Sequence, residues 1–136
     1  MILFMNENEI VQKLKTLTTE LYFMSESDYP FEVFNWGILN DEEIKCKILS
    51  THNPDSTLIE LKTSDLFEKI IRNLKITEES VSISIAKRYE LLFDFIKTNE
   101  FETRVYKCGG IEIDVYILIV MPSKIVLGLK TISIET

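Results

Sequence analysis

The period of the hydrophobic positions changes several times along this chain, and each change predicts an element. Near the N-terminus the apolar residues recur at helical spacing, which predicts an amphipathic helix over residues 8–23. Its apolar stripe consists of Ile10, Leu14, Leu17 and Leu21. Asn6, followed three residues later by Glu9, resembles a capping box that opens this helix.

A run rich in aromatic residues, 31–36, predicts a strand. Pro30 stands before it and favours an extended chain at the preceding residue. Alternate side chains of the run point to opposite faces, and both faces carry large apolar groups. This pattern predicts an interior strand that is covered on both sides. The acidic Ser-Glu-Ser-Asp turn at residues 25–28 then stands at the edge of the fold.

The next alternation, Ile44, Cys46 and Ile48 with lysines between them, predicts a half-exposed strand at a sheet edge. Residues 37–43 connect the two strands, and a short extended piece follows at residues 58–62. Two further apolar stripes at helical spacing, within residues 66–71 and 81–96, predict two helices.

The two predicted helices are separated by a break at residues 73–76. Thr77 is expected to cap the second helix, with Glu78 and Glu79 in its first turn. Beyond residue 101 the chain alternates as strands, with turns at Gly109-Gly110 and Pro122-Ser123, which predicts a three-strand meander. Helices with one apolar stripe must pack on a sheet, so helices are expected on both of its faces. We therefore predict one α+β domain over residues 1–136.

Composition and net charge limit the classes of partner that this protein can bind. The chain has 136 residues, a formal net charge of −7 and 46% hydrophobic residues. The negative charge argues against direct binding of nucleic acid or anionic membrane and favours a basic partner. The apolar start at residues 1–5 is too short for a signal peptide, so a cytoplasmic protein is expected. Cys46 and Cys108 match no metal or redox spacing and are expected to be buried, reduced thiols.

The residues alone give weak support for catalysis. His52 has no triad partners at a recognisable spacing, and we expect it to be a solvent-exposed loop residue. Glu26 with Asp28, and Glu112 with Asp114, are carboxylate pairs that could hold a divalent cation or share a proton. The same pattern is common on solvated sheet faces. A binding protein, a small metal-dependent enzyme and an acidic interaction module for some other basic protein all remain open.

Residues 24–34, M-S-E-S-D-Y-P-F-E-V-F, resemble the signature of the nuclease A inhibitor family. The members of that family are small cytosolic inhibitors of sugar-non-specific DNA/RNA endonucleases. Residues 111–116, I-E-I-D-V-Y, are similar to the penultimate hairpin of the family, and the chain ends in Glu135-Thr136 as a family member does. Residues 37–61 match poorly.

The resemblance implies a three-layer α/β/α sandwich, similar to the pathogenesis-related protein fold, with a mostly antiparallel or mixed central sheet. It also implies tight binding to the active site of a ββα-metal endonuclease, with no catalytic residue and no cofactor in the inhibitor itself. Glu26 is expected to face an arginine of the nuclease, and Thr136 to reach the catalytic divalent metal of the nuclease. Asp28 and Glu135 are expected to add to the negative field. The free protein is expected to be a monomer.

One departure from the family pattern affects the expected interface. A family member carries a tryptophan anchor in the loop between the second and third helices, which corresponds here to residues 73–77. The only tryptophan of this chain is Trp36. Ile76 or Leu74 is the expected replacement, filling a smaller pocket. The difference bears on the affinity and on which nuclease is bound.

Overall fold

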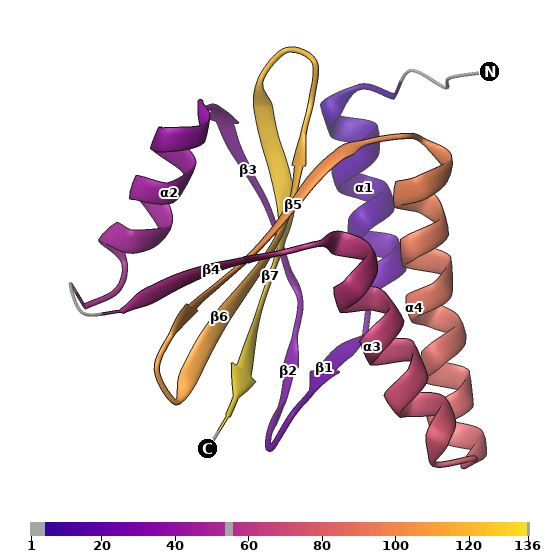
Figure 1. Cartoon of the computed structure of the whole chain (residues 1–136). Helices are drawn as coiled ribbons and strands as arrows, with labels where there is room; N and C mark the ends of the chain where they lie inside the picture. Colours follow the sequence, from indigo (N-terminus) through magenta and orange to yellow (C-terminus); the bar gives the residue numbers. More distant parts are fainter. Residues whose placement is uncertain (1–4, 54–55, 136) are drawn as a thin grey trace.

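A five-stranded antiparallel sheet forms the centre of the molecule (Figure 1). The structure, a computed structural model, describes residues 5–53 and 56–135. In chain order the elements are α1 (Glu7–Thr18), β1 (Tyr22–Met24), β2 (Asp28–Pro30), β3 (Glu32–Ile38), α2 (Asp41–Ser50), β4 (Thr57–Leu61), α3 (Thr63–Ile76), α4 (Ser80–Thr98), β5 (Glu102–Gly109), β6 (Glu112–Val120) and β7 (Ile125–Ile134). The sheet order is β3-β7-β6-β5-β4, and β1 pairs with β2 in a separate hairpin.

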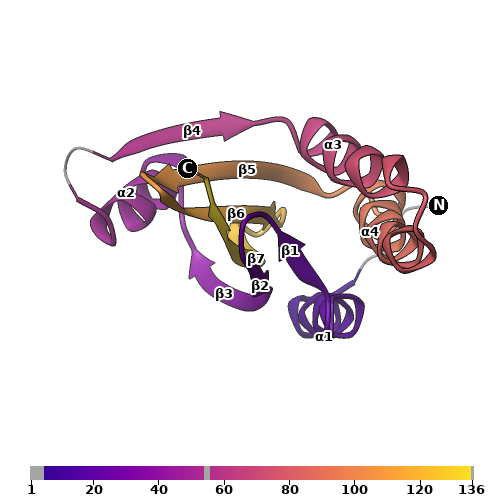
Figure 2. The same cartoon turned by 90° about the horizontal axis from the view of Figure 1, so that it is seen from below.

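Two hydrophobic clusters fill the two faces of the sheet. Side chains along β6 alternate between them: Val115 belongs to one cluster and Tyr116 to the other. Helices α1, α3 and α4 contribute to the first cluster, whereas α2 contributes Ile44 and Ile48 to the second. Figures 1 and 2 show α2 on one side of the sheet and the other three helices on the opposite side. The α+β class and the placement of helices on both faces are confirmed, and this arrangement is compatible with the predicted three-layer sandwich.

The predicted C-terminal meander is also confirmed. Strands β5, β6 and β7 pair antiparallel in chain order. Gly109 has a φ of 144° at the β5–β6 turn, and a Cβ there would collide with the carbonyl oxygen of Glu112. Only glycine fits such a position without strain. The turn therefore depends on the glycine that the sequence pattern had indicated.

The strand predicted from Ile44, Cys46 and Ile48 is wrong, because these residues lie in α2. Ile44 and Ile48 are four residues apart and fully buried on one helix face, at 0% and 1% exposure, whereas Cys46 is exposed. Asn40 caps the helix and forms a complete capping box with Glu43. The capping box and the acidic first turn favour a helix over a strand. Residues that alternate at i, i+2 and i+4 also place the first and the last of them on one face of a helix, so three positions do not distinguish a strand from a helix.

Several helix boundaries and the position of one strand also differ from the predictions. Helix α1 ends at Thr18, not at residue 23, and Glu20 follows it with a φ of 56°. Strand β3 is apolar on both faces as predicted, but it is an edge strand and not an interior one. Helix α3 continues through the predicted break to Ile76, because Leu74 is buried in the first cluster. Helix α4 begins only at Ser80, with Glu79 at its N-cap position, so the prediction that Thr77 caps it is wrong. Within the described residues, no helix is both long and apolar enough to cross a membrane.

Candidate functional site

The acidic turn predicted at residues 25–28 is the tip of the β1–β2 hairpin. Met24 pairs with Asp28 across the hairpin, so Ser25, Glu26 and Ser27 form the connection. Both the backbone N–H of Ser25 and its Oγ donate to the carbonyl oxygen of Ser27, at 3.3 and 2.9 Å. These bonds close a tight turn, and Glu26 is exposed at its tip.

The hairpin is docked beside the last residues of β7. Strand β3 accompanies β7 only as far as Lys130. Beyond that point Thr131 Oγ1 donates to the carbonyl oxygen of Pro30 at 3.0 Å. The backbone N–H of Ile134 donates to Ser25 Oγ at 2.9 Å. Where β3 no longer pairs with β7, the hydroxyls of Thr131 and Ser25 thus connect the β1–β2 hairpin to β7. They hold the acidic turn against the end of the sheet.

A third contact holds the hairpin from the helical side. The Tyr89 hydroxyl of α4 donates to the carbonyl oxygen of Tyr22 at 2.7 Å, and Tyr89 is only 1% exposed. Burial raises the pKa of Tyr89, the Arg88 charge lowers it, and the Asp28 charge raises it further. Tyr89 therefore keeps its proton, and with it this hydrogen bond, throughout the neutral range.

Glu135, the last described residue, is also held by hydrogen bonds. The backbone N–H of Glu135 donates to the carbonyl oxygen of Ile111 at 2.9 Å. Its carboxylate Oε2 accepts a hydrogen bond from Ser133 Oγ at 3.0 Å and lies 3.5 Å from Lys107 Nζ. The Glu135 side chain nevertheless remains 48% exposed. Glu135 is therefore fixed in position and still accessible to a partner.

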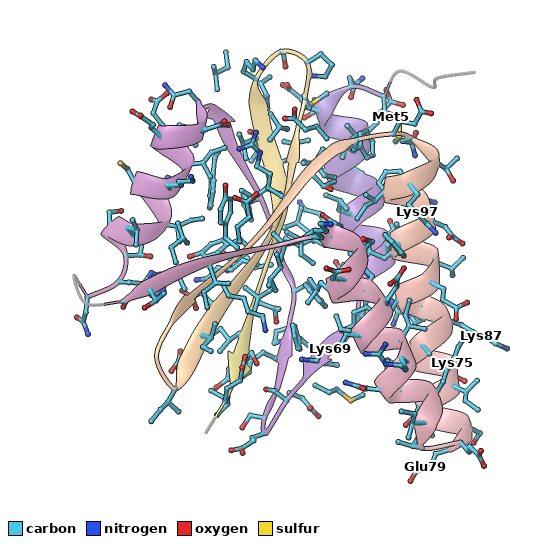
Figure 3. The ribbon with its side chains drawn as sticks, in the orientation of Figure 1. Met5, Lys69, Lys75, Glu79, Lys87 and Lys97 are labelled. Atoms are coloured by element: carbon cyan, nitrogen blue, oxygen red, sulfur yellow. The ribbon has the colours of Figure 1, made fainter. Side chains whose placement is uncertain are left out.

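A cleft of about 670 Å³ joins the acidic turn to this end of β7. Glu26 and Glu135 both line it, as do Lys69 and Lys107. Figure 3 shows Lys69 extending from α3 towards the β1–β2 hairpin. The remaining lining residues come mainly from β1, α3 and the end of β7: Tyr22, Phe23, Met24, Ser25, Leu66, Ile70, Asn73, Leu74, Thr77, Ser82, Tyr89, Ser133 and Ile134.

The structure thus brings two of the five predicted site residues, Glu26 and Glu135, into one cleft. Asp28 is exposed at the start of β2 and does not line the cleft. Ile76, 69% exposed, ends α3 between the lining residues Leu74 and Thr77 but does not itself line the cleft. The α3–α4 connection, the hairpin turn and the end of β7 nevertheless lie at the same end of the molecule (Figures 1 and 2). Thr136 lies outside the described residues.

Sequence reasoning missed the residues that hold the acidic groups in place. Ser25 was recognised only as part of a small polar turn, and its partner Ile134 is 109 positions away. Lys107 and Ser133 come from different strands and meet only at the carboxylate of Glu135. No local pattern marks such contacts. The resemblance pointed to the acidic residues, and only the fold identifies what supports them.

Asp114, one of the second predicted carboxylate pair with Glu112, contacts other side chains of this protein. Asp114 Oδ2 lies 2.9 Å from His52 Nε2, 3.7 Å from Lys130 Nζ and 3.4 Å from the Tyr116 hydroxyl. His52 is therefore not a solvent-exposed loop residue: its side chain is 10% exposed beneath the end of α2, with Nδ1 2.9 Å from the carbonyl oxygen of Ile48. No group of three or more metal-ligating side chains occurs within residues 5–53 and 56–135. The described contacts of Asp114 are those of a structural network that fixes α2 to β6.

Fold and surface together define a small α+β protein that presents acidic side chains along one cleft. Comparison with protein families identifies the family of this protein: the family model described as nuclease A inhibitor-like protein matches residues 8–136. The chain belongs to this family. A search of the curated proteins found no match. Family membership supports a general role as a nuclease inhibitor, exerted through contact with a nuclease.

Proposed function

We propose that this protein inhibits a sugar-non-specific DNA/RNA endonuclease of the ββα-metal type by occupying its active site, and that it catalyses no reaction itself. The observation that carries the proposal is that Glu26 and Glu135 line the same cleft. One active site can receive both residues only if they lie on one side of the inhibitor. We assign the carboxylate of Thr136, the residue that follows Glu135 in the sequence, to the same active site.

Electrostatics supports this assignment of partner. A nuclease active site attracts polyanions, and an inhibitor with a formal net charge of −7 is steered towards it. Glu26 at the tip of a closed turn is suited to a charge-assisted hydrogen bond with an arginine of the nuclease. Divalent cations of the Mg²⁺ type prefer oxygen ligands. The carboxylate of Thr136 is the group that we assign to the nuclease metal.

Two further residues complete the proposed contact. Asp28, exposed at the start of β2, strengthens the negative field beside Glu26. Ile76 presents a large apolar side chain, 69% exposed, at the same end of the molecule. Exposed aliphatic groups next to an acidic surface suit an apolar pocket on a partner. We assign Ile76 the anchoring role that a tryptophan has in a family member.

The cysteines bear on where the protein acts. Cys108 is buried as expected, whereas Cys46 is exposed, which corrects the expectation of two buried cysteines; both are free thiols. Free thiols fit a reducing compartment. We propose that the protein works in the cytoplasm, as a single 1–136 domain that is monomeric until it meets the nuclease.

The proposal is tested by digestion of supercoiled plasmid with purified ββα-metal endonucleases, with and without the protein. Glu26→Ala is expected to weaken inhibition by about 2–5 kcal/mol, because the partner's cation is left unpaired. Glu42→Ala is the matched control: it removes an equal charge from the exposed first turn of α2, on the other face of the sheet. Equal effects of the two substitutions would reduce the role of Glu26 to net charge, and full digestion with excess protein would contradict the proposed function.

A further inference from the structure

The hydroxyl of Ser25 joins the acidic turn to the last strand. We propose that Ser25 is the positioning residue of the inhibitory surface, which sets the spacing between Glu26 and Glu135. This inference rests on the proposed function and adds a residue that touches no reacting group. Its evidence lies entirely within the free protein.

The hydroxyl of Ser25 acts as a hydrogen-bond donor and as a hydrogen-bond acceptor at the same time. Ser25 Oγ accepts from the backbone N–H of Ile134 at 2.9 Å and donates to the carbonyl oxygen of Ser27 at 2.9 Å. A serine hydroxyl has one proton to donate and can accept at the same time. The single side chain therefore closes its own turn and fastens that turn to β7.

The hydrogen bond between Ser25 and Ile134 lies next to both acidic residues of the cleft. It joins Ser25 to Ile134, and each of these residues immediately precedes an acidic residue, Glu26 and Glu135. Consecutive Cα atoms are about 3.8 Å apart, so both acidic residues start within one residue of the bond. A partner that binds both groups gains affinity if their spacing is set before the encounter, because less ordering is left to be done on binding.

The rest of the hairpin is held independently of Ser25. Thr131 Oγ1 fastens the Pro30 end, and the Tyr89 hydroxyl fastens the Tyr22 end. Ser25 lies at the opposite end of the hairpin, beside the turn. Loss of its hydroxyl should therefore leave the hairpin folded and release only its tip. The distance between Glu26 and Glu135 would then vary.

The first arm of the experiment needs no nuclease. Amide hydrogen exchange, followed by NMR, is compared for wild type, Ser25→Ala and Ser25→Thr. The Ile134 amide is expected to exchange about tenfold faster in Ser25→Ala, the loss expected for one net hydrogen bond, and near the wild-type rate in Ser25→Thr. Ser123→Ala, in the exposed β6–β7 turn, is the control. An unchanged Ile134 amide in Ser25→Ala would show that the bond does not form, and would overturn the inference.

The second arm measures inhibition of a ββα-metal endonuclease that the wild-type protein inhibits. Ser25→Ala is expected to raise the inhibition constant about tenfold, and Ser25→Thr to restore it. In a Glu26→Gln background the same Ser25→Ala change should cost less than about threefold, since the group that it positions is already lost. A purely structural serine would give equal losses in the two backgrounds.

The two arms separate the possible failures. A faster Ile134 amide with unchanged inhibition, or equal losses in both Glu26 backgrounds, overturns the positioning role and leaves the proposed function standing. A wild-type protein that inhibits none of the nucleases overturns the proposed function and with it the role of Ser25. In that case the exchange rate of the Ile134 amide still reports whether the bond itself exists.

Discussion

Lys107 Nζ lies 3.5 Å from Glu135 Oε2, so the acidic residue at the end of β7 already faces a cation of its own chain. Ser133 Oγ donates to the same oxygen at 3.0 Å. The carboxylate is therefore oriented by two donors while its side chain stays 48% exposed. A cationic partner that approaches Glu135 must compete with Lys107 for it.

Removal of this internal cation should make association faster. Lys107→Met is expected to raise the association rate with a basic nuclease about two- to threefold at low ionic strength, because one repulsive charge is removed from the binding surface. The gain should shrink as salt is added. Stopped-flow kinetics at two salt concentrations measures it. Lys87→Met removes the same charge from the outward face of α4 (Figure 3) and should have less effect. Slower association of Lys107→Met would contradict the competition argument.

Ile76 should matter for binding and not for folding. It is 69% exposed, so Ile76→Ser is expected to change the free energy of unfolding by less than about 0.5 kcal/mol. Loss of an apolar contact with the nuclease should weaken inhibition by about 1–2 kcal/mol. Leu91→Ser is the control, since Leu91 is 59% exposed on α4 and away from the cleft. Inhibition by Ile76→Ser equal to that of wild type would remove Ile76 from the interface.

The capping box of α2 gives a test of the corrected secondary structure. Asn40 Oδ1 accepts from the Glu43 N–H at 2.8 Å, and Glu43 Oε1 accepts from the Asn40 N–H at 3.0 Å. Asn40→Ala should therefore lower the free energy of unfolding by about 1 kcal/mol. Urea denaturation measures this, with Glu42→Ala as a neighbouring substitution that removes no cap. A strand over residues 44–48 would instead leave the stability of Asn40→Ala unchanged.

Tyr116 should make the fold sensitive to strongly alkaline pH. Burial raises the pKa of Tyr116 to about 12, from an ordinary value of 10.0. Below the ordinary pKa the folded and unfolded states are equally protonated. Between about pH 10 and 12 the unfolded state loses its proton first, so stability falls as the pH rises, by about 2 kcal/mol. Unfolding followed from pH 9 to 12 should show a shallower fall for Tyr116→Phe. An equal slope in both proteins would contradict the assignment.

Long periodic segments could be predicted from the sequence, and short ones could not. The stripe of α4 and the alternation along β5, β6 and β7 extend over many residues, so their periods are unambiguous. Helix α2 has only Ile44 and Ile48 as buried residues, and two positions do not define a period. The three-residue strands β1 and β2 were missed for the same reason.

The candidate site was predictable only in part. The resemblance singled out Glu26 and Glu135, but their convergence depends on the hairpin replacing β3 beside the end of β7. That arrangement is set by Ser25 and Thr131, hydroxyl groups that bond to residues more than 100 positions away. Sequence spacing carries no information about such contacts. The role of Thr136 stays a prediction.

The central claim is that the acidic turn and the C-terminal carboxylate enter one nuclease active site. The most direct measurement is a titration of a ββα-metal endonuclease with this protein and with a variant that carries one extra glycine after Thr136, read as residual plasmid digestion. The account predicts that wild type abolishes digestion at an equimolar ratio, and that the extended variant is at least about tenfold weaker, because its carboxylate is displaced from the metal. Equal potency of the two proteins would contradict it.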